Sequence, residues 1–549
     1  MSQASEHSTA LTAADINNPF YYQENFITVI KWVTEFHARL LLKAELELID
    51  RFLTLPQQPQ ALLIRLLLRK GPLFRVAKLA YPEIDSVAAS ICALETDGWL
   101  TTEAVLGLEN LANLFTKAEL AALLDEDTAH NYSLAKHNKA TFIAALSKQS
   151  GQFTAPEQVV SLGHHALFQR LRLMFFGTLR QDFSAFVTTE LGHTRYEQVQ
   201  LTTDTCAFQC RSDVDTYLYL DELSQNPEQA CAAEMLAALK SQAAQSTSQW
   251  LTRKRSRLLF DLGVKSAREQ QFLVSNEAFE HSTHPAARLR LTRSLERQGA
   301  LEKAFELACA DPLNLDEEVG FERLKVRVGK KISQNYATVV KAFSPPSFQL
   351  TLAPHDNSVE WAALEALQRL DDTSSYHYCE NKLFCALFGL TFWPAIFAPI
   401  QGAFFHPFQR QPNDLYDANF YSRRREIIEQ QFELLTQDPL RLLKRWDEKI
   451  GLSNPFVDWH STDRTLITLA LSCINTTQLI AIFRRMLSSL YNLRRGFPDL
   501  IAFNPTASTF QLIEVKSPTD KLQDHQRAWL QFFAEQKIKA SVCHILYSG

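Results

Sequence analysis

Residues 494–533 read RRGFPDLIAFNPTASTFQLIEVKSPTDKLQDHQRAWLQFF, and this stretch predicts a β-hairpin followed by a helix. Residues 500–503 and 510–516 are apolar enough for two strands, and the Asn, Pro, Thr and Ser between them predict a hairpin loop. Asp520 is expected to cap the helix that follows, with Gln523 at its third position. One face of that helix carries Leu522, Gln526, Trp529 and Phe533, so Gln526 is a polar group aimed at the sheet.

Three ionisable residues of this hairpin have the properties that metal-dependent phosphodiester hydrolysis needs. Asp499 stands at the entrance of the first strand, and Glu514 and Lys516 project to one side of the second, because side chains alternate along a strand. Hard cations prefer oxygen ligands, which Asp499, Glu514 and the backbone carbonyl of Val515 can supply. Lys516 can orient or deprotonate the attacking water, and Gln526 is placed to orient the site.

Each part of this pattern also has a simpler explanation. Pro-Asp and Glu-x-Lys occur often by chance, and a Glu and a Lys on one strand face are usually an exposed ion pair. The combination of these parts argues against chance occurrence or a simple exposed ion pair. An arginine-flanked Gly-Phe-Pro-Asp, two apolar strands, Glu-Val-Lys and a Gln-x-x-Trp helix follow one another in one short segment.

In this order and spacing, the segment resembles the PD-(D/E)xK nuclease fold and, within it, the virus-type replication–repair nuclease (VRR-NUC) subgroup. Most of the chain is similar to the Fanconi-associated nuclease family, most strongly from residue 376 onward. YHYCENKLFCALFGLTFWPAIF at 376–397 and NFYSRRREII at 419–428 also look like blocks of that family. The family's other lineages carry a long disordered N-terminus and a ubiquitin-binding zinc finger, so the resemblance implies a bacterial member.

The resemblance implies a structure-specific DNA nuclease of interstrand-crosslink repair. Such an enzyme cleaves 5′ flaps and related branched DNA, acts as a 5′-to-3′ exonuclease, and uses Mg²⁺ or Mn²⁺, with two ions expected here. Its partner is branched or flapped double-stranded DNA, without a membrane. A cytoplasmic protein that associates with the nucleoid during repair is implied.

The resemblance also adds Glu380, at the position of an acidic metal ligand that the family carries on a helix ahead of the sheet. Leu383, Phe384 and Leu387 follow at i+3, i+4 and i+7, so Glu380 is expected on an apolar helix face. Burying a carboxylate there is costly unless it binds a metal or is paired. A structural ion pair with a nearby Arg or Lys is the alternative explanation.

Basic residues around the hairpin are candidate phosphate ligands. Arg494 and Arg495 could contact phosphate or brace the turn. Lys521 stands where the family has a basic residue near the scissile phosphate. At a further family position that can hold lysine, this chain has His525, which is mostly neutral at pH 7, so a phosphate contact is not expected from it.

The rest of the chain is expected to be multidomain and mainly helical. The predicted order is a winged-helix-like region at 1–105, a SAP-like module at 106–155, an α+β connection at 156–227 and tetratricopeptide-like repeats at 228–375. A C-terminal α/β domain of the PD-(D/E)xK, restriction-endonuclease-like type follows at 376–549. A plain helical bundle is the alternative for the first region. Candidate DNA-backbone ligands outside the nuclease domain are Arg65, Arg69, Lys70, Lys136, Lys139, Arg253, Lys254 and Arg290.

Local signals in these regions predict individual elements. Gly71-Pro72 is expected to separate two helical pieces, and Thr116 with Glu119 predicts a capping box. Lys136 and Lys139 lead into a helix expected at 141–148. Arg290, Arg293 and Arg297 share one face of a helix that ends at Gly299.

Composition sets the limits of these predictions. The formal net charge is −5, so a uniformly basic coat is excluded, but residues 376–549 hold 19 Lys and Arg against 16 Asp and Glu. The 9 cysteines are odd in number and form no Cys-x-x-Cys pair, so the sequence indicates neither a zinc ribbon nor a disulfide framework. The uncharged segment 383–405 is interrupted by Gly and Pro, which favours a buried helix and a loop over a membrane span.

Two other functions stay open. One is a Holliday-junction resolvase or restriction-like nuclease, against which the long helical N-terminal part argues. The other is a catalytically inactive repeat scaffold that binds DNA, against which the intact Asp499, Glu514 and Lys516 argue. Flap-length preference, oligomeric state and protein partners have no signal in the sequence.

Overall fold

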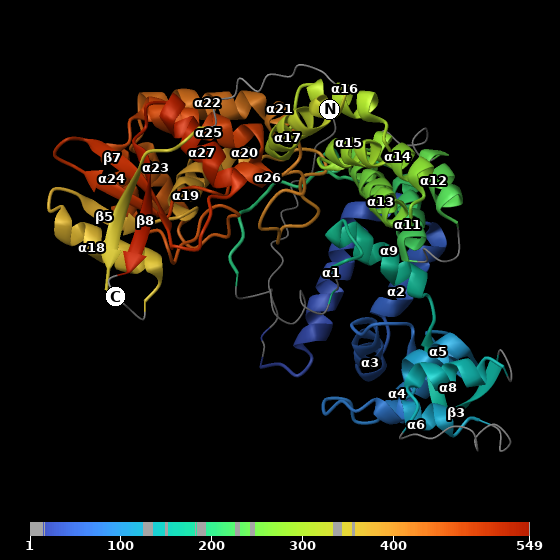
Figure 1. The fold of residues 1–549 in the computed structure, drawn as a ribbon. Coiled ribbons are helices and arrows are strands. Elements are labelled where there is room, and N and C mark those ends of the chain that lie inside the picture. The colour runs from blue at the N-terminus through green and yellow to red at the C-terminus, as the bar shows by residue number, and fades with distance from the viewer. Residues whose placement is uncertain are drawn as a thin grey trace, which may run out of the picture. The chain divides into compact units, whose positions relative to one another are not determined.

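The computed structural model describes residues 15, 17–124, 136–148, 152–181, 183, 194–225, 231–241, 248–332, 343–353 and 357–547. The chain divides into two compact units, Met1–Thr194 and Arg195–Gly549. The described N-terminal part is mainly helical and the C-terminal part contains a five-stranded sheet (Figure 1). The predicted fold class, with a helical N-terminal part and an α/β C-terminal domain, is confirmed.

The first unit builds a winged helix around a three-stranded sheet. Its order β1-β3-β2 places β3 in the middle, antiparallel to both neighbours. Gly98, with φ of 78°, makes the turn from α4 into β2. The elements are α1 (Tyr21–His37), α2 (Lys43–Leu53), α3 (Gln57–Leu67), β1 (Leu73–Arg75), α4 (Val87–Thr96), β2 (Leu100–Gly107), α5 (Leu108–Leu114), α6 (Lys117–Ala121), α8 (Lys139–Leu146), β3 (Gln152–Leu162) and α9 (His165–Phe176).

One local prediction in this unit is wrong. The segment after Gly71-Pro72 is not a second helical piece but the short strand β1, followed by a 3₁₀ turn at Val76–Lys78. The reason is a long-range pairing, because Phe74 lies opposite Val160 of β3. Pairing with a strand far along the chain overrides local helix propensity.

In its described residues, the region predicted to be SAP-like contains α5, α6 and α8, which pack around Leu111, Leu120 and Phe142. The predicted capping box is confirmed, since the Thr116 side chain accepts from the Glu119 backbone N–H and Glu119 accepts from Thr116 N. Helix α8 begins at Lys139, capped by Asn138, and so starts before the expected residue 141.

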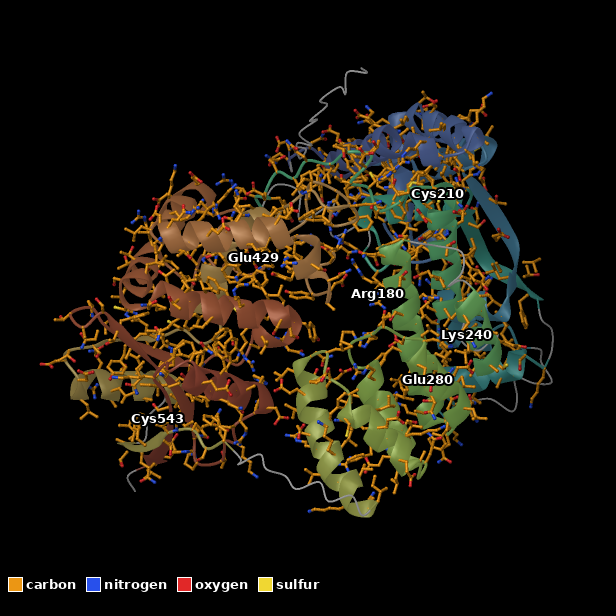
Figure 2. The ribbon with its side chains drawn as sticks, turned by 90° about the horizontal axis from the view of Figure 1, so that it is seen from above. Arg180, Cys210, Lys240, Glu280, Glu429 and Cys543 are labelled. Atoms are coloured by element: carbon orange, nitrogen blue, oxygen red, sulfur yellow. The ribbon has the colours of Figure 1, made fainter. Side chains whose placement is uncertain are left out.

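The second unit begins with antiparallel helices. Lys240 on α12 and Glu280 on α14 are labelled on two neighbouring helices of this stack (Figure 2). The two helices expected around Gly299 are present as α15 and α16, with Gly299 at φ of 80° between them, while their tetratricopeptide-like character stays a prediction. The helices are α11 (Arg211–Gln225), α12 (Ala232–Ser241), α13 (Gln249–Arg268), α14 (Phe272–Glu280), α15 (Ala287–Arg297), α16 (Leu301–Cys309) and α17 (Leu315–Lys331).

The mixed sheet of the second unit has the order β4-β8-β7-β6-β5. The pairs β5–β6 and β6–β7 are antiparallel, as the predicted hairpin requires, while β8 pairs in parallel with β7 and β4. The sheet therefore begins before residue 376, where the nuclease domain was expected to start. Its strands are β4 (Ser347–Leu352), β5 (Ser375–Tyr378), β6 (Leu500–Asn504), β7 (Thr509–Lys516) and β8 (Ala540–Tyr547).

Helices cover both faces of this sheet. Helix α18 (Val359–Leu370) packs on the face that includes Ile513, Val515 and Cys543, the last labelled in Figure 2. Helix α27 (Asp524–Glu535) packs on the opposite face through Trp529 and Phe533. Since Ile513 and Val515 face α18, the alternation of the strand sends Glu514 and Lys516 toward α27, as predicted.

A long helical insertion lies between β5 and β6. It confirms the expected buried helix near residue 383, because α19 is almost wholly buried. Within the described residues no single helix is long and apolar enough to cross a membrane, although α24 and α25, bent by 111°, meet the length and composition criteria as a pair. The insertion consists of α19 (Lys382–Thr391), α20 (Trp393–Ile396), α21 (Phe420–Arg423), α22 (Arg425–Gln437), α23 (Arg441–Lys449), α24 (Arg464–Cys473), α25 (Thr476–Ser488) and α26 (Leu490–Leu493).

Candidate active site

Asp499 lies where three chain segments meet. Its Oδ2 accepts a hydrogen bond of 2.8 Å from the backbone N–H of Val515 on β7. Its backbone carbonyl accepts two more, each 2.9 Å, from the N–H groups of Cys379 and Glu380, which follow β5. The start of β6, the end of β7 and the end of β5 are thus held together at one end of these three neighbouring strands.

Glu514 is the most buried carboxylate of this group, with 1% of the residue exposed. Its Oε1 accepts from the ammonium of Lys516 at 2.8 Å and from the side-chain amide of Gln526 at 2.5 Å. Among the described residues, no group donates to its Oε2, which is buried. A buried carboxylate oxygen without a donor is costly, so this atom is suited to a cation.

Glu380 joins the site from a turn rather than from a helix, so the expected helical position is wrong. Helix α19 begins only at Lys382, and Glu380 precedes it with a left-handed φ of 36°. That conformation is unusual for a non-glycine residue and is held here by the hydrogen bonds of the turn to the carbonyl of Asp499. The Glu380 carboxylate accepts from the Tyr378 hydroxyl and the Asn381 amide, each at 3.0 Å.

Burial raises the pKa values of the two central carboxyl groups in the metal-free protein. Burial raises the pKa of Asp499 to about 6, against the backbone N–H of Val515 and the Lys516 charge, which lower it. For Glu514, burial first and then the neighbouring charge of Asp499 raise the pKa to about 8. Asp499 and Glu514 are buried close together, so ionising both of them is unfavourable. A bound cation beside them would make the doubly ionised state favourable.

The chemistry of these residues fits a divalent cation. Asp499, Glu514 and Glu380 offer only oxygen atoms, which hard cations prefer. Among the described residues, no three carboxylates already lie close enough together to form a finished metal site. Each is instead engaged by protein donors, so binding a metal requires the side chains to exchange some of these hydrogen bonds. The carbonyl of Val515 stays a predicted ligand.

Helix α27 starts later than expected. Gln523 is its N-cap and Gln526 its third residue, whereas Asp520 accepts from Ser517 N and Oγ in the preceding loop. Gln526 therefore has two roles, because its Oε1 accepts from Gln523 N while its amide N–H donates to Glu514. The capping interaction fixes the rotamer of Gln526 that contacts the Glu514 carboxylate.

An aromatic stack fixes the turn that carries Asp499. The ring of Phe497 lies 4.1 Å from that of Trp529 and 4.9 Å from that of Phe384. The indole N–H of Trp529 donates to the carbonyl of Arg495 at 3.0 Å. Because α19 and α27 both contribute to this stack, the position of Asp499 depends on the insertion as well as on the hairpin.

The Tyr378 hydroxyl orients Glu380, so Tyr378→Phe is expected to weaken metal binding. Loss of a hydrogen bond to a metal-binding carboxylate typically costs about 10-fold to 100-fold in metal affinity. Calorimetric titration of Mn²⁺ into the two proteins measures this change. Tyr376→Phe is the matched control, because the Tyr376 hydroxyl donates to Asp371 instead. Equal affinity of the parent and Tyr378→Phe would contradict this role.

A pocket of about 660 Å³ adjoins the site on the α27 side. Arg290 and Arg293 of α15, Arg323 of α17 and Arg495 line it, and so does His525. Burial lowers the pKa of His525, in keeping with its expected neutral state. The predicted face of Arg290, Arg293 and Arg297 is exposed as expected, and two of its three members reach this pocket.

The other predicted basic ligands differ in how far protein groups already engage them. Arg65 pairs with Glu83 at 2.5 Å, and Arg253 and Lys254 pair with Asp417 and Asp221. Such pairing leaves less of their charge for DNA phosphates.

The remaining predicted ligands are more open to solvent. Arg69 contacts the Tyr81 hydroxyl and the Phe74 ring and is exposed, as are Lys70, Lys136 and Lys521. Lys139 is half-buried at the start of α8. Arg494 is half-buried with its guanidinium 4.7 Å from the ring centre of Tyr416, as expected of a residue that braces the turn.

Three residues near the site have no signal in the sequence patterns above. Tyr378 and Asn381 hold the Glu380 carboxylate, and Asn381 also accepts from the backbone N–H of Phe497 at 3.2 Å. Glu360 on α18 adds a negative charge that raises the pKa of Asp499. Only the flanking position of Tyr378 and Asn381 beside Glu380 could have drawn attention to them.

Two family models match the chain. The VRR-NUC domain matches residues 436–545, and the HTH domain described for FAN1 matches residues 20–101. The second match covers helices α1 to α4, where the winged helix lies.

Whole-chain relatives agree with these models. A Fanconi-associated nuclease 1 homolog of Pseudomonas aeruginosa is 38% identical over 540 residues and covers 96% of both chains. Human Fanconi-associated nuclease 1 is 24% identical over 96% of this chain and 63% of its own length. A crystal structure of paFAN1 bound to 2nt 5′ flap DNA with a gap matches with a TM-score of 0.85 and 36% identity, over 98% of this chain and 100% of that one.

Proposed function

The chain belongs to the Fanconi-associated nuclease family, and from this premise we propose that it cuts 5′ flaps and related branched DNA. It also removes nucleotides in the 5′-to-3′ direction and so helps to unhook interstrand crosslinks. It acts on the nucleoid of a bacterial cell. Support for the flap substrate comes from paFAN1, which has been solved with 1nt and 2nt 5′ flap DNA.

One observation carries the catalytic part of this proposal. Glu514 has one oxygen held by Lys516 and Gln526 and a second, buried oxygen without a donor among the described residues. An exposed ion pair, the simpler explanation of Glu-x-Lys, would leave both oxygens hydrated. A catalytically inactive scaffold would gain nothing from a buried carboxylate oxygen without a donor, which destabilises the fold.

The residues divide the work of hydrolysis between them. Asp499, Glu514, Glu380 and the Val515 carbonyl would hold Mg²⁺ or Mn²⁺, with two ions expected. Bound cations polarise the phosphate and stabilise the leaving oxygen. Lys516 orients the attacking water and favours its deprotonation, so that a new P–O bond forms as the bridging P–O bond breaks. Gln526 keeps the Glu514 carboxylate in place.

The arginine-lined pocket supports a path for DNA phosphates beside the cutting site. Arg290 and Arg293 of α15 line it together with Arg495 and with Arg323, which is paired with Asp524, and Lys521 lies in the loop before α27. The exposed Arg69, Lys70 and Lys136 of the first unit are also proposed to bind phosphates of the duplex, and so is the half-buried Lys139. Contacts of this kind are independent of sequence and weaken as salt rises. Arg65, Arg253, Lys254 and Arg494 are the weaker candidates because protein groups already engage them.

The test is cleavage of a labelled 5′-flap substrate with Mg²⁺ by the parent and by Asp499→Ala. The parent is expected to cut near the flap junction, and the variant to lose cutting by about 1,000-fold or more while still binding the DNA. Equal cutting by the variant would contradict the site assignment. Binding without metal-dependent cutting by the parent would favour the inactive scaffold, and preferred cutting of a four-way junction would favour the resolvase.

A further inference from the structure

Helix α18 places a half-exposed tryptophan beside the residues that orient Glu380. Trp361 lies in the first turn of α18, where its backbone N–H donates to Ser358 Oγ at 3.4 Å. Its indole ring lies 6.1 Å from the ring of Tyr378, centre to centre, at an angle of 36°. The Tyr378 hydroxyl donates to Glu380 at 3.0 Å. One tyrosine side chain therefore separates the indole from a proposed metal ligand.

Trp361 does not belong to the core that α18 forms with the sheet. Ala363 and Leu367 are the buried residues of that core, and Ala362 packs beside them. Trp361 is 50% exposed, and in the described part of the chain no hydrogen bond of its indole N–H is found. Large aromatic rings are usually placed where they bury apolar surface. Folding of this chain leaves that surface available for a ligand.

The charges around the two sides of the site favour different parts of a nucleotide. On the α27 side, Arg290, Arg293 and Arg495 offer cations to phosphates, while Arg323 in the same pocket is paired with Asp524 at 2.6 Å. On the α18 side the neighbours of Trp361 are acidic, because Glu360 and Glu380 both add negative charge at Asp499. An acidic setting disfavours a phosphate that no metal neutralises, whereas a nucleobase is uncharged and has an aromatic face.

We propose that Trp361 stacks on a base of the strand being cut, close to the scissile phosphate. The inference rests on the proposed nuclease function of this site. Tyr378 supports the indole from one side and leaves its exposed part for the base. Stacking does not depend on base identity, since every base has a π-face. A stacked base must leave its own helix, so Trp361 favours substrates whose nucleotide at the cut is unpaired or easily unpaired.

Substitution of Trp361 provides the first test. Trp361→Ala is expected to raise the KM for a 5′-flap substrate by about 5-fold to 100-fold, with a smaller change in kcat, because a stacking contact to one base is lost. Trp361→Phe is expected to restore most of this loss, since it keeps a stacking face. Leu370→Ala is the matched control, because Leu370 is 75% exposed at the other end of the same helix. Thermal unfolding of all variants excludes a general loss of fold.

A scan of abasic substrates identifies the stacked base itself. Removing a base near the cut is expected to weaken binding to the parent at one position, and to have no further effect on Trp361→Ala at that position. A 2-aminopurine at the same position is expected to lose fluorescence on binding the parent but not the variant. If Trp361 only braced Tyr378, Trp361→Ala would weaken binding by the same factor at every abasic position, and this result would overturn the inference.

The two proposals fail in different ways. If the parent cuts no DNA in Mg²⁺ or Mn²⁺, the proposed function fails. If the parent cuts flaps while Trp361→Ala keeps the parent's KM and abasic profile, only the stacking role fails.

Discussion

Glu514→Gln is expected to lower the rate of flap cleavage at saturating Mg²⁺ by at least about 1,000-fold. The amide keeps the size of the side chain but removes the negative charge that a cation needs. It also presents an NH₂ group to a position where Lys516 and Gln526 already supply donors. Single-turnover cleavage of the labelled flap measures the effect. Glu302→Gln is the control, because Glu302 is exposed in the first turn of α16.

The same substitution should stabilise the protein when metal is absent. Burial raises the pKa of Glu514 from 4.5 to about 8, so the unfolded chain loses its proton before the folded protein does. The metal-free parent therefore loses stability as the pH rises from about 4.5 to about 8, and Glu514→Gln removes this part of the loss. Thermal unfolding in EDTA across that range, with Glu302→Gln beside it, measures the difference. If Glu514→Gln cut the flap at the parent's rate, the proposed role of Glu514 in catalysis would be contradicted. If it unfolded at a lower temperature than the metal-free parent at pH 8, the buried setting of the Glu514 carboxylate would be contradicted.

Arg424→Met is expected to lower the free energy of unfolding by about 3–5 kcal/mol, because the buried Asp414 carboxylate loses the guanidinium that donates to both of its oxygens and keeps only the ion pair of its Oδ2 with Arg423 among the ion pairs of the described residues. Arg424 is 1% exposed and makes two 2.8 Å hydrogen bonds to the carboxylate of Asp414, which is fully buried. Its Nε also donates to the carbonyl of Ala395 at 2.9 Å. These bonds join the segment before α21 to α20 inside the helical insertion.

An exposed ion pair provides the matched control for this stability effect. Arg464 pairs with Asp447 at 2.8 Å, and both side chains are about half exposed. Arg464→Met should therefore change stability by no more than about 1 kcal/mol. Urea unfolding followed by tryptophan fluorescence compares the two variants. Similar midpoints for both would mean that the Arg424 pair is not the buried support that its contacts indicate.

The relative positions of Glu514, Lys516 and Gln526 were predictable because they depend only on the geometry of one strand and the helix that follows it. Alternation along one strand is enough to send Glu514 and Lys516 to the same side, and helical spacing aims Gln526 at them. The structure adds that Gln526 caps its own helix while it contacts Glu514. The cap at Asp520 was wrong because Ser517 and Asp520 form a local turn that delays the helix.

The parts that sequence patterns missed depend on contacts between distant segments. Glu380 has helical spacing with Leu383, yet the backbone N–H groups of Cys379 and Glu380 donate to the Asp499 carbonyl and hold Glu380 in a turn outside the helix. Trp361 has no motif around it and reaches the site only because α18 packs across the sheet. In the same way, Arg253 looks like a free cation in sequence until Asp417 is folded against it.

The helical insertion between β5 and β6 makes the cutting centre a late product of folding. Glu380 and Asp499 lie on opposite sides of the insertion in sequence, and the bonds between their backbones close that long loop. Closing a long loop lowers the conformational entropy of the chain. Favourable contacts within the insertion offset this cost, so they are expected to form before the two ends of the loop meet. In a partly folded or partly synthesised chain, Glu380 and Asp499, the carboxylates proposed to bind metal, are therefore expected to be apart. The connectivity of the chain thus delays the ability to cut DNA until the helices that position the cut have formed.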